Sequence, residues 1–347
     1  MDQQDDKPSG QGRKPITARE LAQLIGVSQS AVSRAFTPGA SVSPKMRERI
    51  LTFARELDYQ PNAIASMLSK RRTNIVGIVV SDMENPFYPA LIERLSRELQ
   101  KIGLQSLMFN VTKGSNIEDQ LMALRQYNVD AVVIVSATIL SAATLDWATE
   151  NRTAVLVNRT IPDSKLTSVC CHNSEGASAI ADHFYELGHK RVAYVAGLAH
   201  TSTNMERQGA FITRIAELGL TLAANLDGTE YSYESGYNSA LAIAAKGSVD
   251  AIFFANDILA AGGLDALRDE AGLRVPEDIA VAGFDDIAMA SWPHYSLTTF
   301  RQPINQIVAA TVKIIRTGSA QPGRPAKTHL ISGELKVRKS TIGTALT

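Results

Sequence analysis

The stretch IGVSQSAVSRAF, residues 25–36, places a glycine and a valine before a run of small hydroxyl and amide residues that ends near an arginine. A buried helix would carry larger apolar side chains here, and a solvated helix would carry more charge. Gly26 can end a helix through a left-handed conformation that costs little only for glycine. Ser28 can cap the next helix. We therefore predict two short helices joined by a tight turn.

The flanking residues extend this pattern to three helices. Thr17 and Glu20 have the spacing of a capping box at the start of the first helix, and Ser43 followed by Pro44 predicts the start of a third. Apolar residues at helical spacing are expected to close one small core. These are Leu21, Leu24, Ile25, Val32, Ala35, Phe36, Met46, Ile50, Phe53, Ala54 and Leu57.

The second helix then presents a polar face made of Gln29, Ser30, Ser33 and Arg34. Small hydroxyls allow a helix to approach phosphates closely, and glutamine and arginine can form paired hydrogen bonds with adenine and guanine edges. Helix, glycine turn and helix is the helix-turn-helix pattern, in which the second helix enters the major groove. An ordinary amphipathic helix pair is the alternative that these residues leave open.

The segment YQPNAIASMLSKRRTN, residues 59–74, follows the third helix. Pro61 breaks the chain and Asn62 can cap two helical turns, which alone are too short to be stable in water. Leu68 lies beside Lys70, Arg71 and Arg72. This combination suits a helix that folds on DNA and inserts an apolar wedge into the minor groove. A plain charged linker is the alternative.

Length and charge separate this basic head from the rest of the chain. The 347 residues favour two or three folding units. Residues 1–74 carry 12 basic and 7 acidic side chains, while the whole chain has no net charge. A basic head on an acidic body favours a module that binds a polyanion, joined to one that does not.

Several features point to a cytoplasmic protein. Residues 1–15 are polar, without the apolar core of a signal peptide, and are expected to be a disordered tail. No apolar run approaches the length of a membrane span. The adjacent Cys170 and Cys171 cannot bridge each other without strain and have no metal-site spacing, so we expect buried, reduced thiols and no metal.

From residue 75 to 330, apolar strands alternate with amphipathic helices. Strands are expected at 75–81, 104–110, 131–137, 191–197, 251–256 and 279–285, which predicts parallel sheets with ligands bound at the strands' carboxyl ends. Polar pairs stand at those ends: Ser81-Asp82, Asn158-Arg159, Asn256-Asp257 and Asp285-Asp286. Each can simply cap the next helix, but their repetition favours a shared polar cleft. No phosphate-binding or catalytic motif is present, so no cofactor and no enzyme are predicted.

Six stretches of the chain, taken together, are similar to the LacI/GalR (lactose-repressor-type) family of bacterial transcriptional regulators. The resemblance runs from about residue 16 to about residue 342 and rests on these stretches: TARELAQLIGVSQSAVSRAF, VSPKMRERILTFARELDYQPNAIASML, NIVGIVVSDMENPFYPALIERL, ELGHKRVAYVAG, ANDILAAGGLDALRDEAGLRVPEDIAVAGFDDI and LTTFRQPINQI.

The resemblance implies an all-α helix-turn-helix DNA-binding domain over 16–60, a hinge helix over 61–73 and an α/β effector domain over 74–347. The effector domain would resemble a type I periplasmic binding protein, with two doubly wound parallel-sheet subdomains, about 74–171 with 301–331 and about 172–300 with 332–347. It further implies a homodimer on a pseudo-palindromic operator, most simply as a repressor. DNA contacts are expected from Thr17, Ser28, Gln29, Ser30, Ser33, Arg34, Asn62, Ala65 and Leu68.

The resemblance also implies an effector in a cleft between the subdomains, either a sugar, a sugar acid or a nucleoside. The positions matched to the family's contacts are Asn85, Phe87, Tyr88, Asn173, Arg207, Asn256, Asp285 and Gln302. An aromatic face suits a sugar ring, and carboxylate and guanidinium groups suit its hydroxyls. A solute-binding protein that does not bind DNA is the alternative function.

Overall fold

The computed structural model describes residues 16–37, 39–61, 72–111, 117–135, 153–162, 164, 166–228, 230–318 and 326–343. The chain forms two compact units, Met1–Thr73 and Asn74–Thr347, called here the head and the body. The expected tail (1–15) and most of the expected hinge lie outside the described residues. In the described part of the chain, no helix is both long and apolar enough to cross a membrane.

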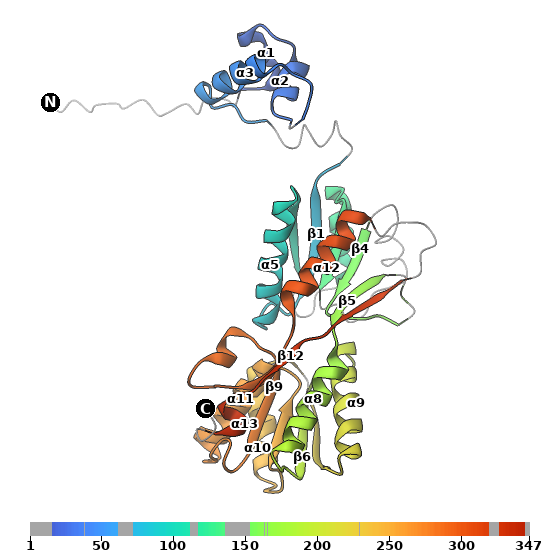
Figure 1. The fold of residues 1–347 in the computed structure, drawn as a ribbon, viewed down its shortest axis with the longest axis vertical. Helices are drawn as coiled ribbons and strands as arrows, with labels where there is room; N and C mark the ends of the chain where they lie inside the picture. The colour runs from blue at the N-terminus through green and yellow to red at the C-terminus, as the bar shows by residue number, and fades with distance from the viewer. Residues whose placement is uncertain are drawn as a thin grey trace, which may run out of the picture. The chain divides into compact units, whose positions relative to one another are not determined.

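The head contains three helices, α1 (Ala18–Ile25), α2 (Gln29–Ala35) and α3 (Pro44–Glu56) (Figure 1). The predicted starts and the predicted turn are confirmed. The Thr17 hydroxyl and the Glu20 carboxylate form a capping box, and Gly26 ends α1 with a φ of 72°. The Ser28 and Ser43 hydroxyls accept hydrogen bonds from the first turns of α2 and α3.

The core of the head contains the predicted apolar residues with one exception. Leu21, Val32 and Ile50 are fully buried, but Leu24 is 62% exposed. Its prediction as a core residue was wrong because, at 3.6 residues per turn, Leu24 lies roughly 100° away from the centre of the face that buries Leu21, Ala22 and Ile25.

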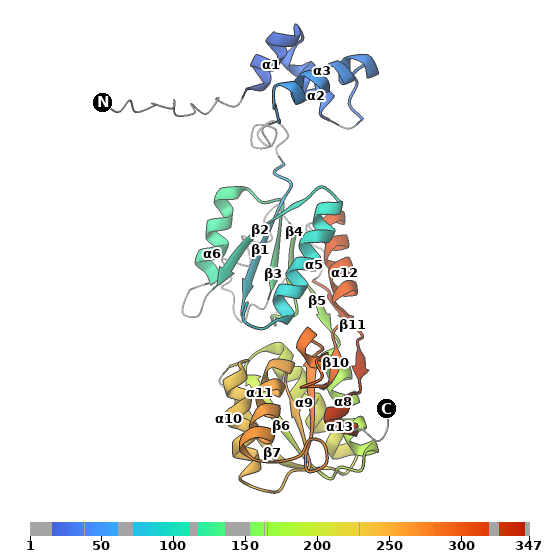
Figure 2. The same cartoon turned by 90° about the vertical axis from the view of Figure 1, so that its left-hand side faces the viewer.

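The body contains two six-stranded sheets, each of which forms one lobe with its helices. In the first lobe the strand order is β11-β5-β4-β3-β1-β2, and every neighbouring pair is parallel. The strands are β1 (Ile75–Ser81), β2 (Gln105–Val111), β3 (Ala131–Val135), β4 (Thr153–Val157), β5 (Thr167–Cys171) and β11 (Thr328–Ile331). Helices α5 (Phe87–Lys101) and α12 (Ile304–Thr317) cover one face of this sheet, and α6 (Ile117–Leu124) covers the other (Figure 2).

The second lobe has the strand order β12-β10-β9-β8-β6-β7 and is parallel except for the β10–β12 pair. Its strands are β6 (Arg191–Leu198), β7 (Thr221–Gly228), β8 (Ala251–Phe254), β9 (Ala280–Asp285), β10 (Thr298–Arg301) and β12 (Glu334–Lys336). Helices α8 (Asn173–Glu186) and α9 (Ser202–Glu217) pack on one face. Helices α10 (Tyr233–Ala244) and α11 (Asp257–Asp265) pack on the other (Figures 1 and 2).

Shorter elements complete the body. They are η1 (Arg125–Tyr127), η2 (Ala266–Glu270), η3 (Ala288–Ser291) and α13 (Lys339–Ile342). The six predicted strands are all present, with ends that shift by one or two residues wherever the structure describes them. The doubly wound parallel architecture is confirmed, with the antiparallel β12 at one edge as the departure from it.

The chain passes between the lobes three times: from β5 to α8, from β10 to α12, and from β11 to β12. The connections between these elements are short. Because the chain crosses three times, each lobe is built from segments that are distant in sequence. Asn173 begins the helix after the first passage, and Gln302 lies in the second.

Close packing of α10 on α11 depends on two glycines. A Cβ at Gly236 would lie 2.0 Å from the Leu259 carbonyl oxygen, and a Cβ at Gly262 would lie 2.0 Å from the Tyr233 carbonyl oxygen. The two helix backbones therefore meet at a distance that only glycine permits.

We predict that Gly236→Ala lowers the melting temperature of the body by several degrees, because overpacking against backbone costs about 1–3 kcal/mol. Gly209→Ala is the matched control, since Gly209 lies in α9 with nothing within 4 Å of an added Cβ. The control should be neutral or stabilising by up to about 1 kcal/mol. Scanning calorimetry of both variants measures this, and equal melting temperatures would contradict the packing argument.

Cys170 and Cys171 are both reduced and buried in β5, as predicted. Burial raises the pKa of each thiol from the ordinary 9.0 to about 12. We expect neither to react with a thiol reagent at pH 8 in the folded protein, whereas both react in guanidinium chloride. Because the folded pKa lies above the unfolded one, the free energy of unfolding should fall as pH rises from about 9 to about 12. Rapid labelling of the native protein at pH 8 would contradict this burial.

Candidate functional site

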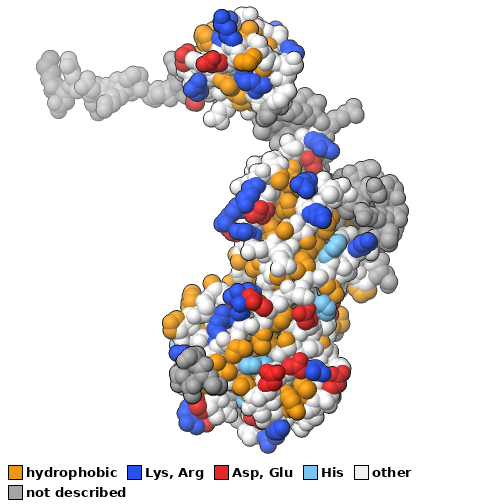
Figure 3. Space-filling model, in the orientation of Figure 1, with side chains coloured by type: hydrophobic (Ala, Val, Ile, Leu, Met, Phe, Trp, Pro, Cys, Tyr) orange, Lys and Arg blue, Asp and Glu red, His pale blue; other side chains and the backbone are white. Residues whose placement is uncertain are grey.

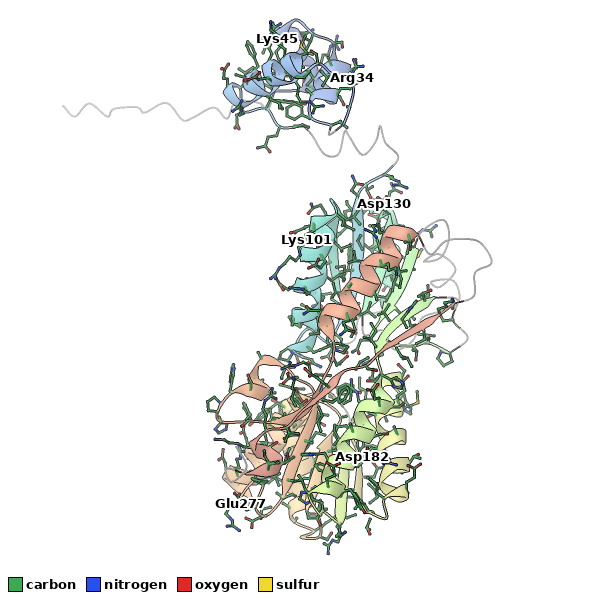
Figure 4. All side chains as sticks on the ribbon, viewed as in Figure 1. Arg34, Lys45, Lys101, Asp130, Asp182 and Glu277 are labelled. Carbon is green, nitrogen blue, oxygen red and sulfur yellow. The ribbon has the colours of Figure 1, made fainter. Side chains whose placement is uncertain are left out.

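The polar face predicted for α2 lies at the surface of the head. Gln29, Ser30, Ser33 and Arg34 are all exposed. Arg34, labelled in Figure 4, makes one side-chain hydrogen bond within the described part of the chain, in which its Nε donates to the Ser30 carbonyl oxygen at 3.3 Å. Its terminal nitrogens remain available for a bidentate contact with an acceptor pair.

Two other arginines of the head hold its turns together. The Arg47 guanidinium donates to the carbonyl oxygens of Ala35, Thr37 and Ala40 at 2.7–3.2 Å, which fixes the loop after α2. Arg49 donates to the Ile25 carbonyl oxygen at 2.9 Å. Arg47 and Arg49 therefore serve the structure of the head, although Arg49 is also exposed. Figure 3 shows basic and acidic side chains on the surface of the head.

The remaining predicted DNA contacts fall into two groups. Thr17 and Ser28 are exposed and use their hydroxyls as helix caps. Asn62, Ala65 and Leu68 lie outside the described residues.

The body contains a pocket between the carboxyl ends of its two sheets. The first lobe contributes residues near the ends of β1 and β4, and the second lobe contributes residues near the ends of β6, β7, β8 and β9. The lining residues are Asn85, Tyr88, Asn158, Arg159, Thr203, Arg207, Tyr231, Asn256 and Asp285. Their side chains leave a cavity of about 10 Å³, which is room for roughly one water molecule.

Arg207 and Asp285 form the charged centre of the second lobe. Arg207 Nη2 lies 3.5 Å from Asp285 Oδ1, and both side chains are buried. Arg207 Nε donates to Asn173 Oδ1 at 2.9 Å, and Nη1 donates to the Ala255 carbonyl oxygen at 2.6 Å. The guanidinium carbon lies 3.6 Å from the centre of the Phe284 ring. Every nitrogen of this guanidinium thus has a protein partner.

Asp285 accepts a second hydrogen bond, from Gln302 Nε2 at 2.7 Å. Burial nevertheless raises the pKa of its carboxyl, with Arg207 as the largest opposing influence. The carboxylate is thus poorly solvated, and further donors from a ligand would stabilise its charged form.

Arg159 has a different environment, at the end of β4 in the first lobe. It is 4% exposed, and its Nη1 donates to the Asn158 carbonyl oxygen and to the Thr203 hydroxyl of the second lobe. Its Nε is buried without a hydrogen-bond acceptor in the described structure. Thr160 N also donates to Ser202 Oγ at 3.0 Å, so the loop after β4 contacts the start of α9 twice.

Two asparagines at strand ends play different roles. Asn256 caps α11 by accepting a hydrogen bond from Leu259 N at 3.1 Å, while its side chain still lines the pocket. Asn158 Nδ2 donates to the Tyr88 hydroxyl at 3.2 Å, and its Oδ1 is buried with no partner among the described residues. The neighbouring Asp257 has a structural role, because its carboxylate accepts hydrogen bonds from Thr299 Oγ1 and Ile287 N.

The pocket brings together five of the eight residues expected to bind an effector: Asn85, Tyr88, Arg207, Asn256 and Asp285. The other three stand behind it. Phe87 lies in the core with its ring 5.3 Å from that of Tyr88, Asn173 holds Arg207, and Gln302 holds Asp285.

Four lining residues were not among the expected contacts: Asn158, Arg159, Thr203 and Tyr231. The polar pair Asn158-Arg159 at a strand end was the available signal for the first two. Thr203 and Tyr231 carry no such signal, because a threonine in a first helical turn and a loop tyrosine are ordinary. In the described part of the chain, no three His, Cys, Asp or Glu side chains are grouped as a metal site.

Comparison with known proteins accounts for both units. Residues 17–62 match the LacI family of bacterial regulatory proteins, and residues 181–341 match the periplasmic binding protein-like domain. The regulator DegA of Bacillus subtilis (strain 168), an HTH-type transcriptional regulator, is 27% identical over 330 residues, which cover 94% of this chain and 98% of DegA.

Two solved structures extend the comparison to the fold. The Lac repressor dimer bound to operator and the anti-inducer ONPF superposes with a TM-score of 0.84 at 24% identity, covering 94% of this chain and 99% of that one. The complex of the transcriptional regulator CelR with cellobiose gives a TM-score of 0.68 at 26% identity, covering 94% and 99%. The chain therefore belongs to the LacI family of bacterial regulatory proteins and is an HTH-type transcriptional regulator with a periplasmic binding protein-like body.

Proposed function

We propose that this regulator binds a pseudo-palindromic operator as a homodimer, most simply as a repressor, and that a small molecule in the body pocket controls its affinity for DNA. The observation that carries the proposal is the pocket itself, where buried polar side chains of two lobes converge in a chain that also has a helix-turn-helix head. A buried polar cluster of this kind costs stability unless it is hydrogen-bonded or binds a ligand.

The DNA-binding side rests on α2. Gln29 and Arg34 can each form paired hydrogen bonds with a base edge, whereas Ser30 and Ser33 allow close approach to the backbone. The first-turn backbone N–H groups of α1 and α2 that the Thr17 and Ser28 caps do not use would donate to phosphates. Asn62, Ala65 and Leu68 would complete the contact in the minor groove.

The effector side rests on Asp285, Arg207 and the two tyrosines of the pocket. A carboxylate held by a guanidinium and an amide can accept hydrogen bonds from the hydroxyls of a polyol. Tyr88 and Tyr231 add an aromatic ring and a hydroxyl from each of the two lobes. The chain is similar to a regulator whose solved complex contains cellobiose, which supports a sugar-like effector. The candidate effectors are sugars, sugar acids and nucleosides.

Coupling between effector and DNA follows from the three passages between the lobes. Asn173 and Gln302, at two of these passages, hold the side chains of Arg207 and Asp285. The cavity of about 10 Å³ is too small for a sugar, so a ligand that contacts this pair and the first lobe together needs the lobes further apart. Its binding thereby changes the relative stability of lobe arrangements. The first lobe begins at β1, directly after the segment that joins it to the head, so the change reaches the DNA-binding side through that segment.

We predict that Arg34→Ala loses about 1–3 kcal/mol of discrimination between the operator and a scrambled duplex. The operator is first selected from a random duplex library with the full-length protein, and affinities are then measured by fluorescence anisotropy at fixed salt. Arg55→Ala is the matched control, because Arg55 is an exposed arginine whose hydrogen bonds are made within α3. Unchanged discrimination in Arg34→Ala would contradict base reading by α2. A wild-type protein that selects no duplex would favour a solute-binding function instead.

We predict that Asp285→Asn abolishes the effector response and preserves operator binding. The carboxamide keeps the shape of the side chain but removes the charge, so effector affinity should fall at least about 100-fold. The probe is the member of a panel of sugars, sugar acids and nucleosides that most stabilises the wild-type protein. Asp182→Asn is the control, because Asp182 pairs with Arg214 on the half-exposed outer side of α8 (Figure 4). Full effector affinity in Asp285→Asn would refute the pocket as the effector site.

A further inference from the structure

The pocket has an unbalanced charge. Its nine lining residues include two arginines and one carboxylate. Arg207 is paired with Asp285, but no carboxylate in the described structure lies within ion-pair distance of Arg159. Asp82 and Asp285 act on it only from a greater distance. The lining therefore carries one net positive charge at a residue that is 96% buried.

The two guanidinium groups also differ in their hydrogen bonds. All three nitrogens of Arg207 contact protein acceptors. In Arg159 only Nη1 does so, with the Asn158 carbonyl oxygen and the Thr203 hydroxyl. Nε is buried without a partner, and Nη2 has no acceptor among the described residues. Nε and Nη2 form one edge of the guanidinium, the edge that binds both oxygens of a planar carboxylate or two oxygens of a phosphate.

An unpaired, nearly buried guanidinium is costly, because burying a charge without a counter-ion removes its hydration. Arginine cannot relieve this cost by losing its proton. Scaffold roles elsewhere in the body do not require such an arrangement, since Arg338 and Arg301 both pair with Asp286. The charge of Arg159 is instead left for a partner that is not part of this chain.

We propose that Arg159 makes the pocket selective for an effector that carries one anionic group, a carboxylate or a phosphate, on a hydroxylated body. The anion binds the Nε–Nη2 edge of Arg159, and ligand hydroxyls donate to Asn158 Oδ1 and Asp285. This inference rests on the proposed function, because it assigns the chemical class of the effector to the same pocket. It identifies Arg159 as the residue that separates acidic effectors from their neutral parents.

The unfilled acceptor Asn158 Oδ1, beside Arg159, supports an effector oriented with its anionic group on Arg159. Asn158 Oδ1 is buried without a partner, and its amide nitrogen is held by Tyr88. A hydroxyl next to the anionic group can therefore donate to Asn158 while the anion accepts from Arg159. A neutral sugar can fill the acceptor but leaves the charge of Arg159 unbalanced, so it should bind more weakly.

The test compares matched ligands on the full-length protein by thermal shift and titration calorimetry. Neutral D-glucose, D-galactose and D-ribose are paired with D-glucuronate, D-galacturonate, D-ribose 5-phosphate and D-glucose 6-phosphate. We expect an acidic member to bind at least about 100-fold more tightly than its neutral parent. Comparison of the uronates with the phosphates identifies which anion is preferred. A neutral sugar that binds as tightly as its acid would overturn the proposal.

The variants Arg159→Met and Arg97→Met supply the second arm. Arg97 is an exposed arginine of α5 that pairs with Glu93, so its substitution gives the same change in net charge away from the pocket. Arg159→Met should abolish the preference for the acid, and Arg97→Met should retain it. Preference retained in Arg159→Met overturns the proposal.

If no ligand of the panel binds, the melting temperatures of the same variants test whether Arg159 is a scaffold residue. Replacing an uncompensated buried ion with an apolar side chain of similar volume is neutral or stabilising. Arg159→Met should therefore melt no lower than Arg97→Met. A lower melting temperature would mean that Arg159 is a scaffold residue, and the proposal would fall.

Operator binding separates this proposal from the function on which it rests. A neutral sugar that changes operator affinity would refute the anionic effector and leave the proposed regulation intact. An acid that binds through Arg159 without changing operator affinity would support the anionic ligand and refute the proposed regulation.

Discussion

The buried contact between Arg207 and Asp285 is the interaction on which the architecture of the pocket depends. Each charge would be costly to bury without partners, and the partners come from separate elements. Asn173 at the start of α8, the Ala255 carbonyl oxygen after β8 and Gln302 after β10 are all within hydrogen-bond distance of the pair. One ion pair thereby fixes the mutual positions of a helix, two strand ends and two passages between the lobes.

The pair is nevertheless not self-sufficient. The closest oxygen–nitrogen distance is 3.5 Å, at the outer limit of a hydrogen bond, whereas Arg207 bonds neutral acceptors at 2.6 and 2.9 Å. Burial outweighs the guanidinium in its effect on the pKa of Asp285, which is raised. A carboxylate in this condition gains from every donor added to it, and hydroxyl groups of a ligand are such donors. Hydrogen bonds added by a polyol would therefore stabilise the charge pair and contribute to the affinity at the same time.

Local rules predicted the parts of the fold that are decided locally. The caps at Thr17, Ser28 and Ser43 and the left-handed Gly26 follow from chemistry within four residues, and the structure confirms them. Leu24 was wrongly placed in the core because apolar character alone does not decide which side of a short helix is covered. The strands were predictable from their unbroken apolar runs, whereas the order of strands in each sheet depends on contacts between distant segments.

The pocket was predictable in its location and only partly in its members. Polar residues at the ends of parallel strands must meet at one edge of a sheet, which indicated Asn256 and Asp285. Thr203 and Tyr231 reach the same space from a helix start and a loop, and the polar residues at strand ends do not indicate them. Phe87 has the residue type of a sugar-stacking platform but is only 2% exposed, since α5 turns it toward the sheet.

Residue type at a strand end does not separate scaffold from binding site, because both use the same polar groups. Asp257 uses both carboxylate oxygens on Thr299 and on the backbone of Ile287, and it does not line the pocket. Asn158 and Arg159 occupy the equivalent place after β4 but keep Oδ1 and Nε unfilled. A buried polar atom without a partner costs about 1–3 kcal/mol, which a purely structural residue has no reason to retain. Gln302 Oε1, directly behind the pocket, is the third such atom in the described residues. These unfilled atoms, rather than the residue types, mark where the chemistry of this body is directed at a molecule other than itself.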